Sequence, residues 1–188
     1  MELPVMVALA VLVAFVVKTF VAQAYYIPSG SMIPQLEVND RVVVSKLAYH
    51  FHDPRRGDIV VFDAPGPRPP DRESVPARGV RAVLQAIGLS APSTEEYIKR
   101  VVGLPHDRVE ARGGRVLVDG RALVEPYLPP GDVTADFGPV DVGAGQLLVL
   151  GDNRGNSADS RSFGPIGRST VVGRAIVRMW PPGRLAFL

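Results

Sequence analysis

Residues 96–103 have the sequence EYIKRVVG and are followed by Leu104-Pro105, where the proline interrupts regular pairing. Hydrophobic residues lie on both sides of Lys99, so we expect a strand that is covered on both faces. Burial there would strip water from the Lys99 ammonium and lower its pKa. The alternative is an exposed strand position, which is the commoner place for a lone lysine.

Other short apolar runs surround this segment in the sequence, at residues 40–44, 58–62, 146–150 and 171–180. Their length favours strands over helices. Residues 109–124 predict one or two hairpins with turns at Gly113-Gly114 and Asp119-Gly120, and a stretch rich in Pro, Gly and Asp follows. The pattern predicts a mostly β fold, a barrel or sandwich, with a small inserted β subdomain at about residues 109–140.

Residues 64–95 separate two of these strands and predict a loop followed by a helix. Residues 64–76 are rich in Pro, Gly and charge, whereas apolar residues recur at helical spacing within 77–89, at Val80, Val83, Leu84 and Ile87. The same segment carries Arg78 and Arg81. Such a helix packs against the domain or lies on a membrane surface.

The N-terminal segment is apolar from residue 3 to residue 24, except for Lys18, Thr19 and Gln23. As a helix it would be about 33 Å long, which is enough to span a bilayer. We therefore expect a single transmembrane anchor over residues 1–24 and one domain over residues 25–188. The alternative is a cleaved signal peptide, because Ala22-Gln23-Ala24 resembles a cleavage site, although no basic residue precedes the apolar run.

The sequence PSGSM at residues 28–32 follows directly after this segment. Its proline and glycine favour a bent, exposed backbone. Ser29 and Ser31 are two residues apart, so in an extended segment both hydroxyls face the same side. One could attack a carbonyl carbon while the other donates a hydrogen bond to the carbonyl oxygen. The alternative is a plain linker between an anchor and a domain.

The composition restricts the chemistry. The 188 residues include no cysteine, which excludes a thiol nucleophile, and the net charge of +2 does not favour nucleic acid as a partner. The three histidines read as surface turns, without the spacing of a metal site: His50, His52 and His106. A serine nucleophile needs a base, and arginine stays protonated, so the candidates are the three lysines at positions 18, 46 and 99. Lys18 fits the membrane interface and Lys46 a solvated strand end, which leaves Lys99.

The loop at residues 151–161 is dense in hydrogen-bonding side chains. A hydroxyl such as that of Ser157 could orient a neutral Lys99 amine without adding a charge. Two acids and two arginines in the loop could pair with one another and stiffen it: Asp152, Arg154, Asp159 and Arg161. The alternative for each of them is a solvated loop position.

At four successive places the sequence resembles the bacterial type I signal peptidases. The matching segments are PSGSMIP at 28–34, RGDIVVF at 56–62, YIKRVVGLP at 97–105, and GDNR at 151–154 continued by Ser157, Asp159, Ser160 and Arg161. The resemblance implies a membrane-anchored Ser/Lys endopeptidase that removes signal peptides from exported preproteins. It departs from the family at Gln35, at His106 and in the insertion at 64–95.

The resemblance also implies roles for individual residues. Ser31 would be the nucleophile and Lys99 the general base, with the Ser29 hydroxyl and the Ser31 N–H forming the oxyanion hole and Ser157 orienting the lysine. The site would be supported by Asp152, Asn153, Arg154, Asp159 and Arg161. Two shallow pockets for an Ala-X-Ala cleavage site would be lined by Tyr25, Ile27, Met32, Leu36, Tyr97 and Ile98.

The resemblance further implies a location and partners. The chain would cross the bacterial cytoplasmic membrane once, with its catalytic domain on the extracytoplasmic side near the secretion translocon. Its partners would be preproteins and the lipid bilayer, without nucleic acid, metal or organic cofactor.

Three other classes of protein compare less well. A self-cleaving Ser/Lys repressor would carry a DNA-binding module, and a penicillin-binding acyltransferase would have a serine followed three residues later by lysine, which does not occur here. A non-catalytic membrane-anchored β domain that serves as an assembly or adaptor subunit remains the alternative. Labelling of Ser31 by a serine-directed acylating inhibitor would exclude it.

Overall fold

The computed structural model describes Met6, Leu9 and residues 21–66 and 96–188. Within these residues two sheets form, and the three predicted strands of the first half are all present: β2 (Arg41–Ser45), β3 (Ile59–Asp63) and β4 (Glu96–Gly103). The remaining strands are β1 (Ala22–Tyr26), β5 (Arg108–Arg112), β6 (Arg115–Val118), β7 (Arg121–Ala122), β8 (Phe137–Asp141), β9 (Gln146–Leu150), β10 (Ile166–Gly167), β11 (Val171–Trp180) and β12 (Ala186–Phe187). Short helical turns join them: α2 (Ala48–Phe51), α4 (Ser160–Phe163), η2 (Arg168–Thr170) and η3 (Pro182–Arg184).

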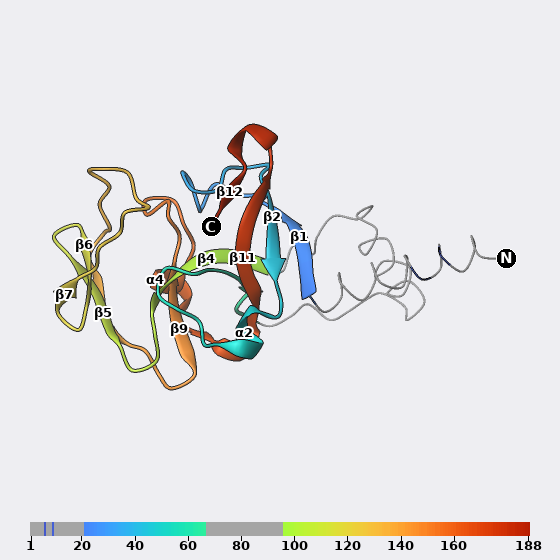
Figure 1. Cartoon of the computed structure of the whole chain (residues 1–188). Coiled ribbons are helices and arrows are strands. Elements are labelled where there is room, and N and C mark those ends of the chain that lie inside the picture. Colours follow the sequence, from blue (N-terminus) through green and yellow to red (C-terminus); the bar gives the residue numbers. More distant parts are fainter. Residues whose placement is uncertain (1–5, 7–8, 10–20, 67–95) are drawn as a thin grey trace.

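The large sheet has eight strands in the order β1-β2-β11-β3-β4-β9-β10, and β12 pairs with β11. Its pairs are antiparallel, and Lys99 of β4 lies opposite Val60 of β3. The small sheet, in the order β7-β6-β5-β8, is inserted between β4 and β9 and lies at the end of the molecule away from β1 (Figure 1). The mostly β prediction is confirmed.

Three apolar clusters form the core. The first contains Ile59, Val61 and Ile98 with side chains from β1, β2 and the Met32–Leu36 turn. The second contains the alternate residues of β3, Val60 and Phe62, together with residues of β4 and β9. The third joins β4 and β9 to the small sheet. Because apolar clusters cover both faces of β3 and β4, the sequence of these strands is apolar without alternation.

The structure corrects the predicted end of the N-terminal helix. Residues 22–24 belong to β1, in which Ala22 pairs with Ser45 and Ala24 with Val43 of β2. Tyr25, the next residue, is buried in the core. In the predicted helix, the backbone groups of residues 22–24 would have bonded within the helix. In the structure they bond to β2 instead.

Two predictions lie outside the described residues. These are most of the anchor over residues 1–24 and all but the first three residues of the loop and helix over residues 64–95. Within the described part of the chain, no helix is long and apolar enough to span a bilayer. A one-turn helix, α2, occurs between β2 and β3 where the sequence indicated only a turn.

Candidate active site

The serine-rich segment follows β1 and folds into a turn. The Leu36 N–H donates to the Met32 carbonyl at 2.8 Å, and both side chains are fully buried in the first core cluster. These apolar anchors draw the segment into the molecule, so that Ser31 is only 9% exposed. The expectation of an exposed segment is therefore wrong for Ser31, because the neighbouring Met32 side chain is needed in the core.

Lys99 reaches this serine from the central strand. Its Nζ lies 2.7 Å from Ser31 Oγ and donates a second hydrogen bond of 2.9 Å to the Ile98 carbonyl. The Tyr97 ring centroid lies 5.5 Å from the same nitrogen. Two residues that are 68 positions apart in the sequence are thus held in hydrogen-bonding contact.

Burial lowers the pKa of Lys99. The side chain is in the core, and loss of hydration brings its pKa from 10.5 down to about 8, although the charges of Asp159 and Asp152 act in the opposite direction. The sequence prediction of a buried lysine with a lowered pKa is confirmed. With this pKa about one amine in ten is uncharged at pH 7 and about half are uncharged at pH 8, where they can accept a proton.

The second hydroxyl lies beside the first. Ser29 Oγ is 3.4 Å from Ser31 Oγ, so the two side chains face the same side of the segment, as their spacing predicts. The segment is held from behind by Asn153, whose backbone N–H donates to the Ser31 carbonyl and whose side-chain amide donates to the Gly30 carbonyl, each at 3.0 Å. The backbone around Ser31 is therefore fixed by the loop at 151–156.

Gly151 permits this close approach. A Cβ atom at this position would overlap Ser157 Oγ and would lie 2.5 Å from the Ser31 carbonyl oxygen. The Gly151 N–H donates to Asp159 at 2.9 Å, which holds the loop from its other side. A residue without a side chain is required here because two backbones meet.

Asp159 and Arg161 pair with each other, as the sequence predicts. Arg161 donates two hydrogen bonds of 2.8 Å to the Asp159 carboxylate, which is fully buried. Burial acts to raise the pKa of Asp159, but the bonds from Arg161 and from the Gly151 N–H outweigh it and hold that pKa below its usual value. Asp159 therefore remains charged near Lys99.

The other two charged residues of the loop pair outside it. Asp152 accepts hydrogen bonds of 2.8 and 2.6 Å from Arg100 of β4, and Arg154 donates bonds of 3.1 and 2.6 Å to Glu125. The prediction that the four loop residues pair with one another is thus wrong for Asp152 and Arg154. Sequence reasoning missed Arg100 and Glu125. Arg100 carried a usable signal, since a charge inside an apolar strand needs a buried partner.

Ser157 lies at the site, but no hydrogen bond joins it to Lys99. Its Oγ is buried near the Asp159 carboxylate and has no hydrogen-bond partner of normal geometry among the described residues. The Lys99 amine donates to the Ile98 carbonyl, whereas the resemblance implied that the Ser157 hydroxyl would orient this amine. The orienting role of Ser157 remains a prediction.

The residues expected to line substrate pockets fall into two groups. Five of them belong to the first core cluster and are buried: Tyr25, Ile27, Met32, Leu36 and Ile98. Tyr97 belongs instead to the cluster on the other face of β3 and β4, where its ring meets Phe62 and Phe163 edge-on or tilted. The structure thus brings most of this set together on the side of the sheet that carries the Met32 turn.

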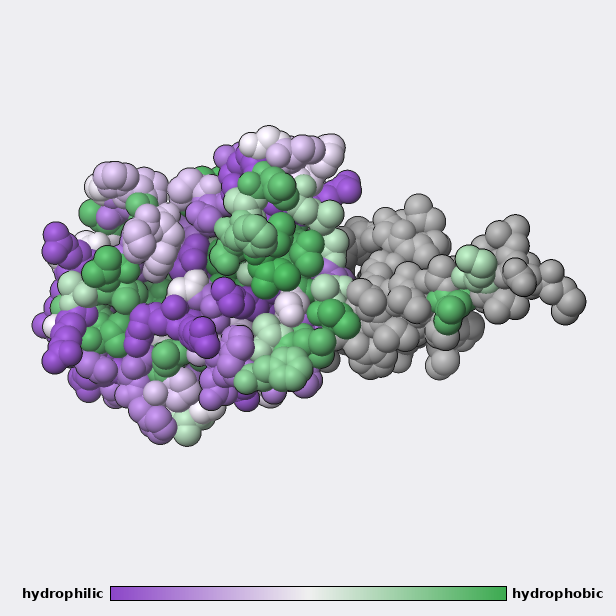
Figure 2. All heavy atoms as spheres, in the orientation of Figure 1, coloured by the Kyte–Doolittle hydropathy of each residue, from purple (hydrophilic) through white to green (hydrophobic). Residues whose placement is uncertain are grey.

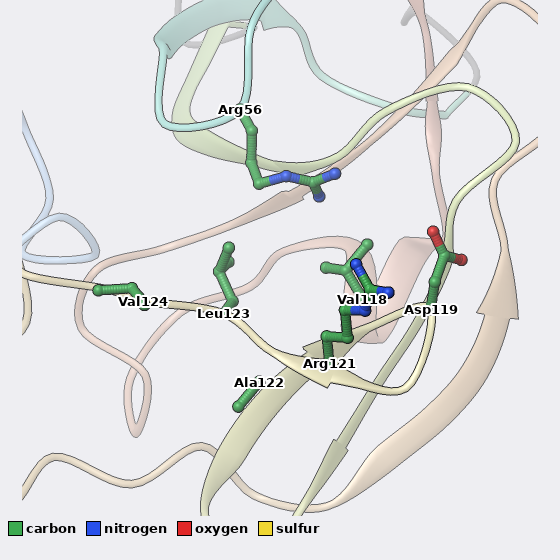
Figure 3. Close-up of a pocket in the computed structure, with 7 residues that line it drawn as sticks. All are labelled: Arg56, Val118, Asp119, Arg121, Ala122, Leu123 and Val124. Atoms are coloured by element: carbon green, nitrogen blue, oxygen red, sulfur yellow. The ribbon is translucent and has the colours of Figure 1, made fainter.

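A hollow of about 650 Å³ lies elsewhere, between Arg56 and the strands β6 and β7 (Figure 3). It is lined by Arg56, Val118, Asp119, Arg121, Ala122, Leu123 and Val124, none of which contributes to the Ser31–Lys99 group. Arg56 itself is held by Asp107 at 3.0 Å and by the Val102 carbonyl. In the described part of the chain, no group of three His, Cys, Asp or Glu side chains has a metal-binding arrangement.

A buried serine hydroxyl in contact with a lysine of lowered pKa is the arrangement of serine hydrolases that use an amine as their base. Known proteins agree with this class. A family model described as signal peptidase, peptidase S26, matches residues 1–180. This chain therefore belongs to the signal peptidase family, peptidase S26, and is a serine endopeptidase.

Two curated relatives support the assignment. The chain is 46% identical over 185 residues to a signal peptidase I of Leptolyngbya laminosa. The aligned region covers 97% of this chain and 80% of that protein. It is 37% identical over 215 residues to a signal peptidase I of Mycobacterium tuberculosis, covering 97% and 73% respectively. This chain was also compared with the crystal structure of a signal peptidase I from Enterococcus faecalis. The two sequences are 27% identical, the superposition covers 65% of this chain and 96% of that chain, and the TM-score is 0.45.

Proposed function

We propose that this chain removes signal peptides from exported preproteins, with Ser31 as the nucleophile and Lys99 as the general base. The observation that carries this proposal is the distance of 2.7 Å between Lys99 Nζ and Ser31 Oγ, with both groups buried. A serine hydroxyl is a weak nucleophile unless a base removes its proton, and this amine is the base in reach. Its pKa of about 8 makes it effective near neutral pH.

The reaction has two steps. Ser31 Oγ attacks the carbonyl carbon of the second small residue of the cleavage site, while Lys99 accepts the hydroxyl proton. The Ser31 N–H and the Ser29 hydroxyl donate hydrogen bonds to the oxyanion, and Lys99 returns the proton to the leaving amine as the peptide bond breaks. Water then attacks the acyl carbon of the acyl-enzyme and gives a proton to Lys99. Lys99 returns this proton to Ser31 Oγ as the ester bond breaks, and the signal peptide leaves with a free carboxylate.

The supporting residues act on the geometry of this reaction. Asn153 fixes the Ser31 backbone, and the pairs Asp152–Arg100 and Asp159–Arg161 fix the loop that carries Asn153. We propose that Ser157 turns to the Lys99 amine during the reaction, because its buried hydroxyl otherwise lacks a partner. Such a rotation would release Lys99 from the Ile98 carbonyl.

Substrate recognition is proposed for the first core cluster and its surroundings. Tyr25, Ile27, Met32, Leu36 and Ile98 belong to one buried apolar cluster, which includes Met32, the residue next to Ser31. Shallow apolar hollows beside this cluster would accept the small side chains of an Ala-X-Ala site. Larger side chains would have to displace core residues. We extend the proposal to Tyr97, whose ring lies near the lysine amine.

We also propose that the apolar segment preceding β1 anchors the chain in the bacterial cytoplasmic membrane, with the domain on the extracytoplasmic side near the translocon. Exposed apolar side chains on the domain support contact with lipid. They include Met179, Trp180, Leu185 and Phe187 of the C-terminal segment. In Figure 2 hydrophobic residues gather over the part of the molecule where β2, β11 and β12 lie in Figure 1. Tryptophan is enriched where proteins meet the headgroup region.

The proposed substrate can be tested by incubating the purified protein in detergent with a preprotein that carries an Ala-X-Ala cleavage site. Mass spectrometry is expected to show a single new N-terminus directly after the second alanine. The matched control is the same preprotein with a bulky residue in place of that alanine, which should remain uncut. Cleavage of both preproteins alike, or of neither, would contradict the proposed specificity.

The pKa of Lys99 predicts the pH dependence. Because the base must be uncharged, kcat/KM is expected to rise with pH and to level off above about 8, where the amine has lost its proton. Initial rates measured between pH 6 and 10 with a peptide substrate that carries no titratable side chain would show this limb. A rate that is constant over that range, or that falls across it, would exclude Lys99 as the base.

A further inference from the structure

Three residues of the connection between β7 and β8 reach the charged groups behind the active site: Glu125, Tyr127 and Thr134, whose hydroxyl accepts a hydrogen bond of 2.8 Å from Arg154. Glu125 binds Arg154 through two hydrogen bonds of 3.1 and 2.6 Å, and the Arg154 side chain is only 1% exposed. Tyr127 donates its hydroxyl to Glu125 at 2.6 Å and places its ring 3.9 Å from the Arg100 guanidinium carbon. Burial and the neighbouring Glu125 raise the pKa of Tyr127, so its hydroxyl stays protonated and remains a donor.

The two arginines hold the loop that fixes Ser31. Arg154 Nε donates to the Gly151 carbonyl at 3.0 Å, and Arg100 pairs with Asp152. Asn153, which lies between Asp152 and Arg154 in the sequence, donates its N–H to the Ser31 carbonyl. Glu125 and Tyr127 are therefore connected to the loop that fixes Ser31 through Arg154, which belongs to that loop, and through Arg100, which pairs with Asp152.

Charge balance explains why a carboxylate is needed at position 125. Arg154 and Arg100 are both buried cations, and Asp152 is close enough to influence both of them. Without the Glu125 carboxylate, Arg154 would compete with Arg100 for Asp152, because a buried cation without a partner is strongly disfavoured. Any such exchange would move Asp152 and with it the adjacent Asn153, which positions the nucleophile.

We propose that Glu125 and Tyr127 are positioning residues for signal-peptide cleavage: by holding Arg154 and Arg100 apart, they keep Asp152 and Asn153 where Ser31 is correctly placed. The proposal rests on the Ser31–Lys99 mechanism. It assigns a role in the reaction to the insertion that contains the small sheet, through contacts between residues 29 positions apart in sequence.

The test compares Glu125→Gln, Tyr127→Leu and Tyr127→Phe with the unaltered protein in steady-state cleavage of a signal-peptide substrate. Glu125→Gln and Tyr127→Leu are expected to lower kcat about tenfold or more with KM changed less than about twofold, since misplaced reacting groups affect the chemical step. Tyr127→Phe keeps the ring on Arg100 and should retain at least half of the activity. Glu110→Gln is the control, because Glu110 pairs with an exposed arginine of the same sheet.

The outcomes separate this proposal from the mechanism on which it rests. Ser31→Ala is assayed in the same series. If Ser31→Ala is inactive while Glu125→Gln and Tyr127→Leu keep their kcat, the positioning role is wrong and the Ser/Lys mechanism stands. If Ser31→Ala remains active, the mechanism itself fails. Should Glu125→Gln not fold, Tyr127→Leu decides, because it removes no buried charge; a lower unfolding temperature with unchanged kcat would show a structural role only.

Discussion

Replacement of Lys99 by methionine is expected to lower kcat/KM for signal-peptide cleavage by about 10⁴-fold, the upper range for loss of a general base. Methionine has nearly the length of lysine and fills the buried position without a titratable group. Ser31 Oγ, which lies 2.7 Å from Lys99 Nζ, then has no base to accept its proton. No other lysine of the described residues is in contact with this hydroxyl, so no replacement base is in place.

The same substitution should not destabilise the fold. Below pH 8 Lys99 is protonated in both the folded and the unfolded protein, and burial of the ammonium costs free energy in the folded state. Between pH 8 and 10.5 only the unfolded state binds the proton, so the stability of the unaltered protein rises with pH across this window. The difference in pKa sets a ceiling of about 3 kcal/mol for the stability gained at pH 7. Loss of the bond to the Ile98 carbonyl offsets part of it.

Cleavage assays together with thermal unfolding at pH 7 check both parts of this expectation. Ser31→Ala should lose activity to a similar extent, and the double variant should be no less active than either single variant, since the two groups act as a unit. Lys46→Met is the matched control, because this lysine follows β2 and is remote in sequence from the strand that carries Lys99. Retention of more than about a tenth of the activity by Lys99→Met would refute the assignment of the base.

Gly151→Ala is expected to lower kcat/KM by about 10²-fold, because it displaces the backbone of the nucleophile. The added methyl group would lie 2.5 Å from the Ser31 carbonyl oxygen, which the Asn153 N–H also binds. The methyl group would also lie 2.5 Å from Ser157 Cβ, which rotation of the Ser157 side chain does not move. The Ser31 carbonyl likewise cannot move without shifting its own residue. Misplacement of a reacting group by about 1 Å is enough for a loss of this size.

Gly155→Ala provides the control for this substitution. It lies in the same loop, and a Cβ atom there would meet nothing within 4 Å. Its kinetic constants should equal those of the unaltered protein. The measurement is the rate of acylation of Ser31 by a serine-directed inhibitor, which reports the nucleophile directly. Equal rates for the two alanine variants would show that the close approach at Gly151 does not position Ser31.

Much of the fold could be predicted from the sequence. The strand at 171–180 has the predicted bounds, and the strands at 40–44, 58–62, 96–103 and 146–150 were located to within a residue. These segments are short apolar runs bounded by Gly, Pro and Asp, so local composition and tertiary burial favour the same structure. The hairpin turns at Gly113-Gly114 and Asp119-Gly120 were also predicted from the sequence. In the structure all four of these residues have the positive φ that such turns require.

Less of the site could be predicted. The sequence left Lys99 as the base because only three lysines were available, the resemblance to type I signal peptidases implied Ser31 as the nucleophile, and the sequence located the charged loop. It did not reveal that Asp152 binds Arg100 or that Arg154 binds Glu125, which are 52 and 29 residues apart. Complementary charge is present at many positions of the chain, and nothing local selects one partner over another.

By itself, the sequence determined the strands, the position of the serine pair and the low pKa expected of a lysine placed within an apolar strand. Only the tertiary structure decided that residues 22–24 join β1, that Ser31 is drawn inward by Met32, and that Glu125 lies behind the catalytic loop. The physical reason is one of range. Strand formation depends on side chains a few residues apart, whereas strand pairing, core packing and ion pairing depend on contacts that exist only after distant segments have met.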